Sequence, residues 1–321
     1  MKNQYIYAAT RLHAMEDSML SRQNIERIFT SSTIDDALSV LSQKGYDCTS
    51  LTTVEELIDR EQEKTLKLVS SLVEDMSVFD VLFYTGDFQN LKAAVKSIAN
   101  EDYLAGLFVA GGTIPPEVIA QAVEKRKFDI LPKFLRDTAK NARKLFLETG
   151  DGALCDRMID RACLDTILER GKQSDCKMIR DYAELTVALG DIKIALRGAR
   201  LGKKIEFFKQ SLANCDSISV SLLEKAAANG EKDVLEYLKL TDYGESGEAW
   251  KEGYEVFEKW CDDKVMEKVK EHRFNYFTLA PIAAYILAKN TEFKTVRIAV
   301  TALQNQIDAK KVRERLRELY V

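Results

Sequence analysis

Hydrophobic positions along the chain recur three or four residues apart, which is the period of an amphipathic helix. Thr53 and Glu56 have the spacing of a capping box, in which the two side chains bond free N–H groups at a helix start. Ser221 and Glu224 repeat this spacing and predict a second helix start. Strand-like alternation is nowhere sustained. The pattern therefore predicts an all-α protein.

Residues that interrupt helices are few, with 4 Pro and 15 Gly in 321 residues, and this favours long helices joined by short turns. Pro115 and Pro116 suit the first turn of a helix over Glu117–Lys127, where a missing N–H is harmless. The longest apolar stretches, Leu104–Ala110 and Leu279–Ala288, are shorter than the roughly 20 residues needed to cross a bilayer. We expect no transmembrane segment.

A pattern recurs along the chain about every hundred residues. Gly86-Asp87-Phe88 returns as Gly190-Asp191-Ile192, and a third acid, Glu292, follows after a similar interval. Each occurrence belongs to a stretch with two apolar residues five apart near its start, and these stretches begin near Leu20, Ile114 and Ser217–Ile218. A truncated fourth start lies near Ile307. The matches are short, but they agree in order and spacing.

The repeats predict an N-terminal helix at 1–19, helical repeats at 20–113, 114–217 and 218–306, and a C-terminal helix at 307–321. Each repeat would bury its apolar face against the next one. Three such layers can stack as an arc or close into a ring, and the periodicity does not choose between them.

Charge is nearly balanced, with 47 Lys and Arg against 51 Asp and Glu. No basic run is interleaved with aromatic residues, so we expect no nucleic-acid partner. The stretch Lys289–Val321 is mildly basic, with eight Lys and Arg against four Asp and Glu. The six cysteines are scattered without a CxxC pair, and Met1–Ala9 does not resemble a secretion signal. These features predict free thiols and a cytoplasmic protein.

Candidate metal and nucleotide sites fail on spacing. The chain has two histidines and no HExxH motif, so we expect no metal site. Gly198–Lys204 resembles a phosphate-binding loop, but its glycines are one residue too close and Lys204 replaces the Ser or Thr that would hold magnesium. We expect this segment to lie within a helix, where its small residues allow close packing. No cofactor is predicted.

Catalytic arrangements are also missing. Asp35-Asp36 and Asp262-Asp263 lack the third acid of the DDxxD motif of all-helical prenyl-transfer enzymes. No GxSxG elbow is present, and neither histidine has an evident nucleophile partner. The sequence predicts a non-catalytic protein and disfavours a cryptic all-α enzyme.

The repeated acids are each followed by basic or amide side chains, which makes them the candidate functional residues. The candidates are Asp87, Asn90, Lys92 and Lys96, then Asp191, Arg197 and Arg200, and finally Glu292 and Arg297. One interpretation is that acids at helix starts and bases further along complement the helix dipole. The other is that the bases of the three repeats line a common opening that receives an acidic or polar partner helix.

The chain resembles the C subunit of bacterial and archaeal V/A-type ATP synthases, which corresponds to the d subunit of eukaryotic V-type ATPases. The resemblance covers nearly the whole length and is carried by Tyr5-Ile-Tyr7-Ala, Arg11-Leu12, Gly86-Asp-Phe-Gln-Asn90-Leu-Lys92, Ala188-Leu-Gly190-Asp191, Ala195-Leu-Arg197, Val296-Arg297-Ile298 and Val312-Arg-Glu-Arg-Leu316. Ile194 and Thr295 stand where the first repeat has Asn90, so the resemblance implies no shared role for that amide.

The resemblance implies a funnel-shaped, all-α socket with pseudo-threefold symmetry. Such a protein sits on the membrane rotor ring, receives the central axle, and couples ion flow to ATP turnover without binding nucleotide. It would be peripheral to the membrane through the ring. The alternative is an α-solenoid scaffold that displays a peptide-binding groove, although repeats of roughly 100 residues are longer than those of known solenoids.

Overall fold

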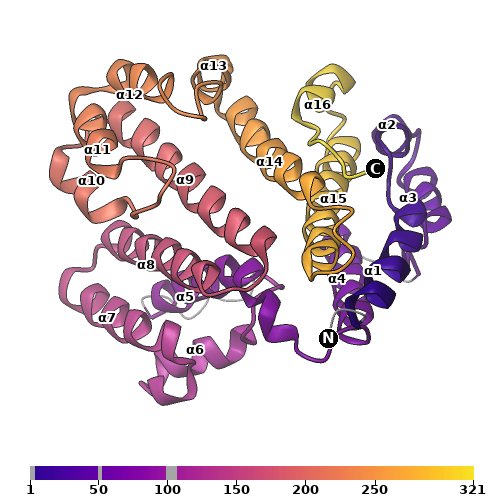
Figure 1. The fold of residues 1–321 in the computed structure, drawn as a ribbon, viewed down its shortest axis with the longest axis horizontal. Coiled ribbons are helices and arrows are strands. Elements are labelled where there is room, and N and C mark those ends of the chain that lie inside the picture. Colours follow the sequence, from indigo (N-terminus) through magenta and orange to yellow (C-terminus); the bar gives the residue numbers. More distant parts are fainter. Residues whose placement is uncertain (1–3, 50–52, 99–106) are drawn as a thin grey trace. The chain divides into compact units, whose positions relative to one another are not determined.

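The computed structural model describes residues 4–49, 53–98 and 107–321, and all regular elements in these ranges are helices (Figure 1). The predicted all-α class is therefore confirmed. The chain forms two compact units. Unit 1 comprises residues 1–77, 176–182 and 245–321, and unit 2 comprises residues 78–175 and 183–244. The division into three repeats and the funnel shape remain predictions.

Unit 1 is built from the two ends of the chain. Its helices are α1 (Gln4–Met15), η1 (Glu16–Ser18), α2 (Arg22–Phe29), α3 (Ile34–Gln43), α4 (Val54–Ser70), α13 (Ser246–Glu252), α14 (Tyr254–Glu271), α15 (Ala280–Gln304) and α16 (Ala309–Arg315). The short helix η2 (Met76–Leu82) leads from unit 1 into unit 2.

Unit 2 contains the middle of the chain. Its helices are α5 (Tyr84–Lys96), α6 (Pro116–Glu124), η4 (Phe128–Ile130), α7 (Lys133–Thr149), α8 (Gly152–Lys172), α10 (Ile205–Ser211), α11 (Val220–Asn229) and α12 (Glu231–Leu238). Helix α9 (Lys177–Arg200) lies mostly in this unit, and its first residues belong to unit 1.

Helix α15 is the core helix of unit 1, where it contacts α1, α2, α3, α4, α14 and α16. Its first part, from Ala280 to Lys289, is buried on all sides, whereas Lys294, Arg297 and Thr301 further along form an exposed stripe. Phe293 and Val296 pack in one buried cluster with Leu20, Ile25 and Leu57 from the N-terminal part of the chain. Helix α15 thus joins elements from both ends of the sequence into one core.

Two predicted helix starts have different outcomes. The Thr53 side chain accepts a hydrogen bond from the Glu56 N–H at 3.2 Å and caps α4, which confirms the first. The second is wrong, because α11 begins at Val220 and places Ser221 inside the helix. Ser219, whose backbone N–H donates to the Tyr237 hydroxyl, stands at the start instead.

Helix α6 is shorter than predicted. Pro116 occupies its first position, as expected, but the helix ends at Glu124 rather than Lys127. Arg126 adopts a left-handed backbone with φ of 56°, and the Lys127 N–H turns back to the Ala122 carbonyl at 3.0 Å. This geometry is a common helix ending and is normally occupied by glycine.

Within the described residues, no helix is both long and apolar enough to cross a membrane. Of the apolar stretch Leu104–Ala110, residues 104–106 lie outside the described ranges. All six cysteines are free thiols, as predicted.

Candidate functional site

The three repeated acids are buried, with relative exposures of 0% for Asp87, 0% for Asp191 and 1% for Glu292. Asp87 lies in the first turn of α5, whereas Asp191 and Glu292 lie deep within α9 and α15. The helix-dipole interpretation is therefore wrong for the last two, since that effect fades beyond the first turn. A different interaction must account for these buried carboxylates.

Asp87 binds the chain segment that enters α6. Its Oδ1 accepts the Ile114 N–H at 3.0 Å, and its Oδ2 accepts the Thr113 hydroxyl at 2.6 Å. A Cβ at Gly112 would lie only 2.3 Å from Asp87 Oδ1, so glycine is required for this approach. Burial raises the pKa of Asp87, and the hydrogen bonds from Thr113 and Ile114 oppose the rise.

Asn90 holds the same segment one turn further along α5. Its side-chain oxygen accepts the Val109 N–H at 2.8 Å, and its side-chain nitrogen donates to the Val109 carbonyl at 3.1 Å. A buried amide that pairs with both groups of one backbone residue fixes that residue firmly. The side chains of Asp87 and Asn90 thus together attach the segment before α6 to α5.

Asp191 also accepts a backbone N–H, but only one of its two carboxylate oxygens is hydrogen-bonded. Its Oδ1 accepts the Ala213 N–H at 2.9 Å, whereas its buried Oδ2 has no hydrogen-bond partner in the described structure. Burial raises the pKa of Asp191 to about 8, against the lowering effect of the Ala213 bond. On the same helix, Glu184 Oε1 accepts the N–H groups of Asp216 and Ser217 at 2.8 and 2.7 Å. Together the two acids of α9 hold the loop that precedes α11.

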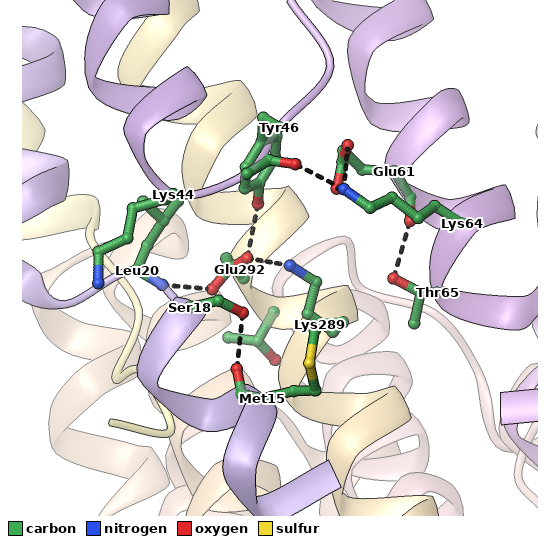
Figure 2. A network of polar contacts seen from close by, with 12 residues as sticks. Met15, Ser18, Leu20, Lys44, Tyr46, Glu61, Lys64, Thr65, Lys289 and Glu292 are labelled. Carbon is green, nitrogen blue, oxygen red and sulfur yellow. Dashed lines mark hydrogen bonds and ion pairs between the residues drawn. The ribbon is translucent and has the colours of Figure 1, made fainter. Parts of the chain in front are cut away.

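Glu292 is the centre of a buried polar network in unit 1 (Figure 2). Its Oε2 accepts the Leu20 N–H at 2.7 Å, and its Oε1 accepts the Tyr46 hydroxyl at 2.6 Å. Lys289, one turn earlier on α15, forms an ion pair with Oε1 and lies over the rings of Tyr46 and Phe293. Burial, followed by the Glu292 charge, raises the pKa of Tyr46. The network attaches the N-terminal segment to the core helix.

The predicted basic residues are exposed or, in the case of Lys92 and Lys96, half-buried, and most are paired with acids. Lys92 pairs with Asp160, and Lys96 Nζ lies 2.7 Å from Asp156 Oδ2. The guanidinium groups of Arg200 and Arg297 form two-point pairs, which join Arg200 to Glu231 and Arg297 to Glu55. Arg197 is exposed on α9. The structure therefore places the predicted acids in the core and the predicted bases outside it.

The acid pair Asp262-Asp263 attaches the C-terminal residues to α14. Asp262 pairs with Lys294 at 2.8 Å and with Arg317 at 2.9 Å, and Asp263 accepts the Glu318 N–H at 2.6 Å. Although burial favours the neutral acid, the two cations hold the pKa of Asp262 below its usual range. The pair has a structural role in holding the chain end.

The segment that resembles a phosphate loop ends a helix. The prediction that it lies within a helix is correct only up to Arg200, the last residue of α9. A Cβ at Gly198 would lie 2.5 Å from the Phe208 ring, so this glycine permits close packing, as predicted. Gly202 lies beyond the helix and adopts a left-handed φ of 64°, which ends it.

Within the described residues, no group of three or more His, Cys, Asp or Glu side chains is arranged to hold a metal ion. Sequence reasoning missed the partners of the acids. Lys289 lies three residues before Glu292 in the sequence and could have been found from helical spacing. Tyr46 and Leu20 are far from Glu292 in the sequence, and no local signal connects them.

Comparison with known proteins identifies relatives along nearly the whole chain. The C subunit of the A-type ATP synthase of Desulfurococcus sp. is 25% identical, over 97% of this chain and 90% of the relative. The C subunit of the V-type sodium ATPase of Enterococcus hirae is 20% identical, over 96% of this chain and 97% of the relative.

The family described as ATP synthase (C/AC39) subunit matches residues 8–315. This range includes all of unit 2, most of unit 1 and all three repeated acids. The resemblance inferred from the sequence is thereby confirmed: the chain belongs to the ATP synthase (C/AC39) subunit family.

Proposed function

We propose that this protein is the non-catalytic central-stalk subunit of an A/V-type ATPase, where it couples the central axle to the membrane rotor ring. The observation that carries the proposal is the family match over residues 8–315. The named relatives are subunits of A-type ATP synthases and of a V-type sodium ATPase. A cytoplasmic location, peripheral to the membrane through the ring, is part of the proposal.

The contacts of the buried acids support three related repeats. Asp87 binds the N–H of Ile114, the expected first residue of the second repeat, and Glu292 binds the N–H of Leu20, the expected first residue of the first. Asp191 binds Ala213, slightly before the expected third start. The acids of the first and third proposed repeats thus each attach the first residue of another repeat, and the acid of the second attaches the segment just before the third start. This order of attachments supports the proposed repeats.

The helix starts support the same repeats. Each of four buried residues is the fourth residue of a short helix, namely Ile25 in α2, Ile119 in α6, Leu223 in α11 and Val312 in α16. Buried attachment of successive segments also suits transmission of torque, because groups fixed in the core resist local opening. We therefore propose that the acids stiffen the coupler, while the bases near them lie where a partner can reach them.

The proposal predicts that the purified chain binds both the isolated axle protein and the detergent-solubilised rotor ring. The variant R197E/R200E should bind the axle more weakly, by on the order of tenfold or more, if these bases face the opening. The matched variant K225E/K232E reverses two exposed lysines of α11 and α12 and should bind like the original protein. Capture on immobilised axle and on immobilised ring measures both affinities.

Failure to bind either component would reject the coupling role. Unchanged axle binding by R197E/R200E would reject only the basic opening. An α-solenoid scaffold would bind neither component.

A further inference from the structure

Positive charge is concentrated in the turn between α6 and α7 and along α7. Between residues 124 and 144 there are eight Lys and Arg against three Asp and Glu, although the whole chain has a net charge of −4. Six of these cations are exposed, and in the described structure no acid pairs with five of them. We call these five the basic surface: Lys125, Arg126, Lys127, Lys133 and Lys140.

The basic surface belongs to one compact part of unit 2 (Figure 1, α6 and α7). The Arg143 side chain of α7 donates to the Val123 carbonyl of α6 at 2.8 Å, and Arg136 donates to the carbonyls of Asp129 and Leu131. Lys133 and Lys140 are two turns apart on α7 and share a face of that helix. Burial and the nearby Arg126 charge lower the pKa of Arg143. The bonds of Arg136 and Arg143 thus attach α7 to α6 and to the turn that carries the cations.

Arg126 occupies a position where folding alone favours glycine. Its left-handed φ of 56° is uncommon for a residue with a side chain. The same turn at the end of α9 has Gly202 at this position. In both turns the next residue donates its N–H to a carbonyl of the helix at 3.0 Å, from Lys127 to Ala122 and from Lys203 to Gly198. A cation at this strained position is therefore not explained by the geometry of the turn.

An exposed apolar residue lies among the cations. Ile130 is 45% exposed in η4, between the Lys125–Lys127 run and Lys133. Cations that flank an apolar tip are typical of segments that bind anionic membrane surfaces. Nucleic acid is less suited, since the aromatic rings of this segment, Phe128 and Phe134, are half-buried and offer little surface for stacking on bases.

We propose that the basic surface binds the anionic headgroups of a lipid membrane, with Ile130 at its tip. The inference goes beyond the proposed coupling function and rests on it only for nearness to a membrane. Lipid contact would be additional to any contact with the rotor ring. Each cation near an anionic surface adds to binding, and added salt weakens the attraction.

Sedimentation with lipid vesicles tests the proposal. The purified chain should bind vesicles of phosphatidylcholine mixed with phosphatidylglycerol, and not vesicles of phosphatidylcholine alone. The variant K125E/R126E/K127E should bind the anionic vesicles more weakly, by on the order of a hundredfold. The control K209E/K225E/K232E makes the same change of charge at exposed lysines of α10, α11 and α12 and should bind normally. Arg126→Gly should fold at least as stably as the original and still bind more weakly.

Absence of binding to anionic vesicles, or equal binding by the charge-reversed variant and its control, would overturn the proposal. So would equal binding to neutral vesicles. A third result is that the original protein binds no vesicles while the variant no longer binds one protein component of the complex. In that case the partner of the basic surface would be an acidic protein surface. The variant should still bind axle and ring, so failure of the lipid proposal is distinguishable from failure of the coupling proposal.

Discussion

Replacing Glu292 by alanine is expected to lower the free energy of unfolding by about 3–5 kcal/mol, because the Lys289 ammonium would stay buried without its counter-charge. The Leu20 N–H and the Tyr46 hydroxyl would lose their acceptor as well. Each unsatisfied buried group adds a penalty of its own. Urea unfolding of the purified variant, followed by circular dichroism, measures the loss.

Two comparisons separate the buried charge from other effects of the substitution. The variant Glu55→Ala removes the ion pair of Glu55 with Arg297, whose side chains are 54% and 44% exposed, and should cost only about 0–1 kcal/mol. The double variant K289M/E292L removes both buried charges and should be less destabilised than Glu292→Ala. A loss below about 1 kcal/mol in Glu292→Ala would show that the network contributes little to stability.

The second large effect concerns the pH dependence of stability. The pKa of Asp191 is about 8 in the folded protein against an ordinary value of 3.8, and burial is the main cause. Between pH about 4 and about 8 the folded protein keeps a proton that the unfolded chain has released. Stability from this group is therefore fully present below pH about 4 and declines as the pH rises to about 8. Above that pH the decline levels off.

The variant Asp191→Asn should lose this part of the pH dependence. A tenfold change in proton affinity corresponds to about 1.4 kcal/mol, so the displacement of the pKa from 3.8 to about 8 amounts to several kcal/mol. At pH 9 the asparagine variant should thus be more stable than the original protein, and the gain should shrink towards pH 5. Urea unfolding at a series of pH values measures this difference.

The groups around Asp191 must be kept unchanged in this comparison. They are Arg161 and Asp165 on α8 and Glu184 on α9. The control is Asp87→Asn, because both oxygens of Asp87 accept hydrogen bonds and the second one has the Thr113 hydroxyl as partner. Its effect on stability should vary less with pH. A stability difference between Asp191→Asn and the original protein that is constant from pH 5 to pH 9 would contradict the assignment.

The sequence predicted those features that depend on local spacing. The helical class, the cap at Thr53 and the close packing at Gly198 follow from neighbouring residues, and the structure agrees. The start of α11 was misplaced because Ser221 matches the capping pattern as well as any true cap does. The end of α6 was misplaced because a left-handed arginine has no signature in the sequence.

The role of the acids could be predicted only in part. The repetition of Asp87, Asp191 and Glu292 is visible in the sequence, but their burial and their backbone partners are not. The bond from Tyr46 to Glu292 joins residues separated by 246 positions, and such a contact depends on the packing of the whole unit. The basic surface has no clear signal in the sequence, because the acids of the rest of the chain outweigh its charges, and its exposure appears only in the structure.

Coupling between ATP hydrolysis and ion transport tests the central claim most directly. The ATPase would be reconstituted into vesicles with and without this protein, and ATP hydrolysis and ATP-driven ion uptake would be measured on the same preparation. We predict that without it the soluble head still hydrolyses ATP while ion uptake stops, and that adding the purified chain restores uptake. Ion uptake that persists at its full rate in the absence of the protein would contradict a coupling role.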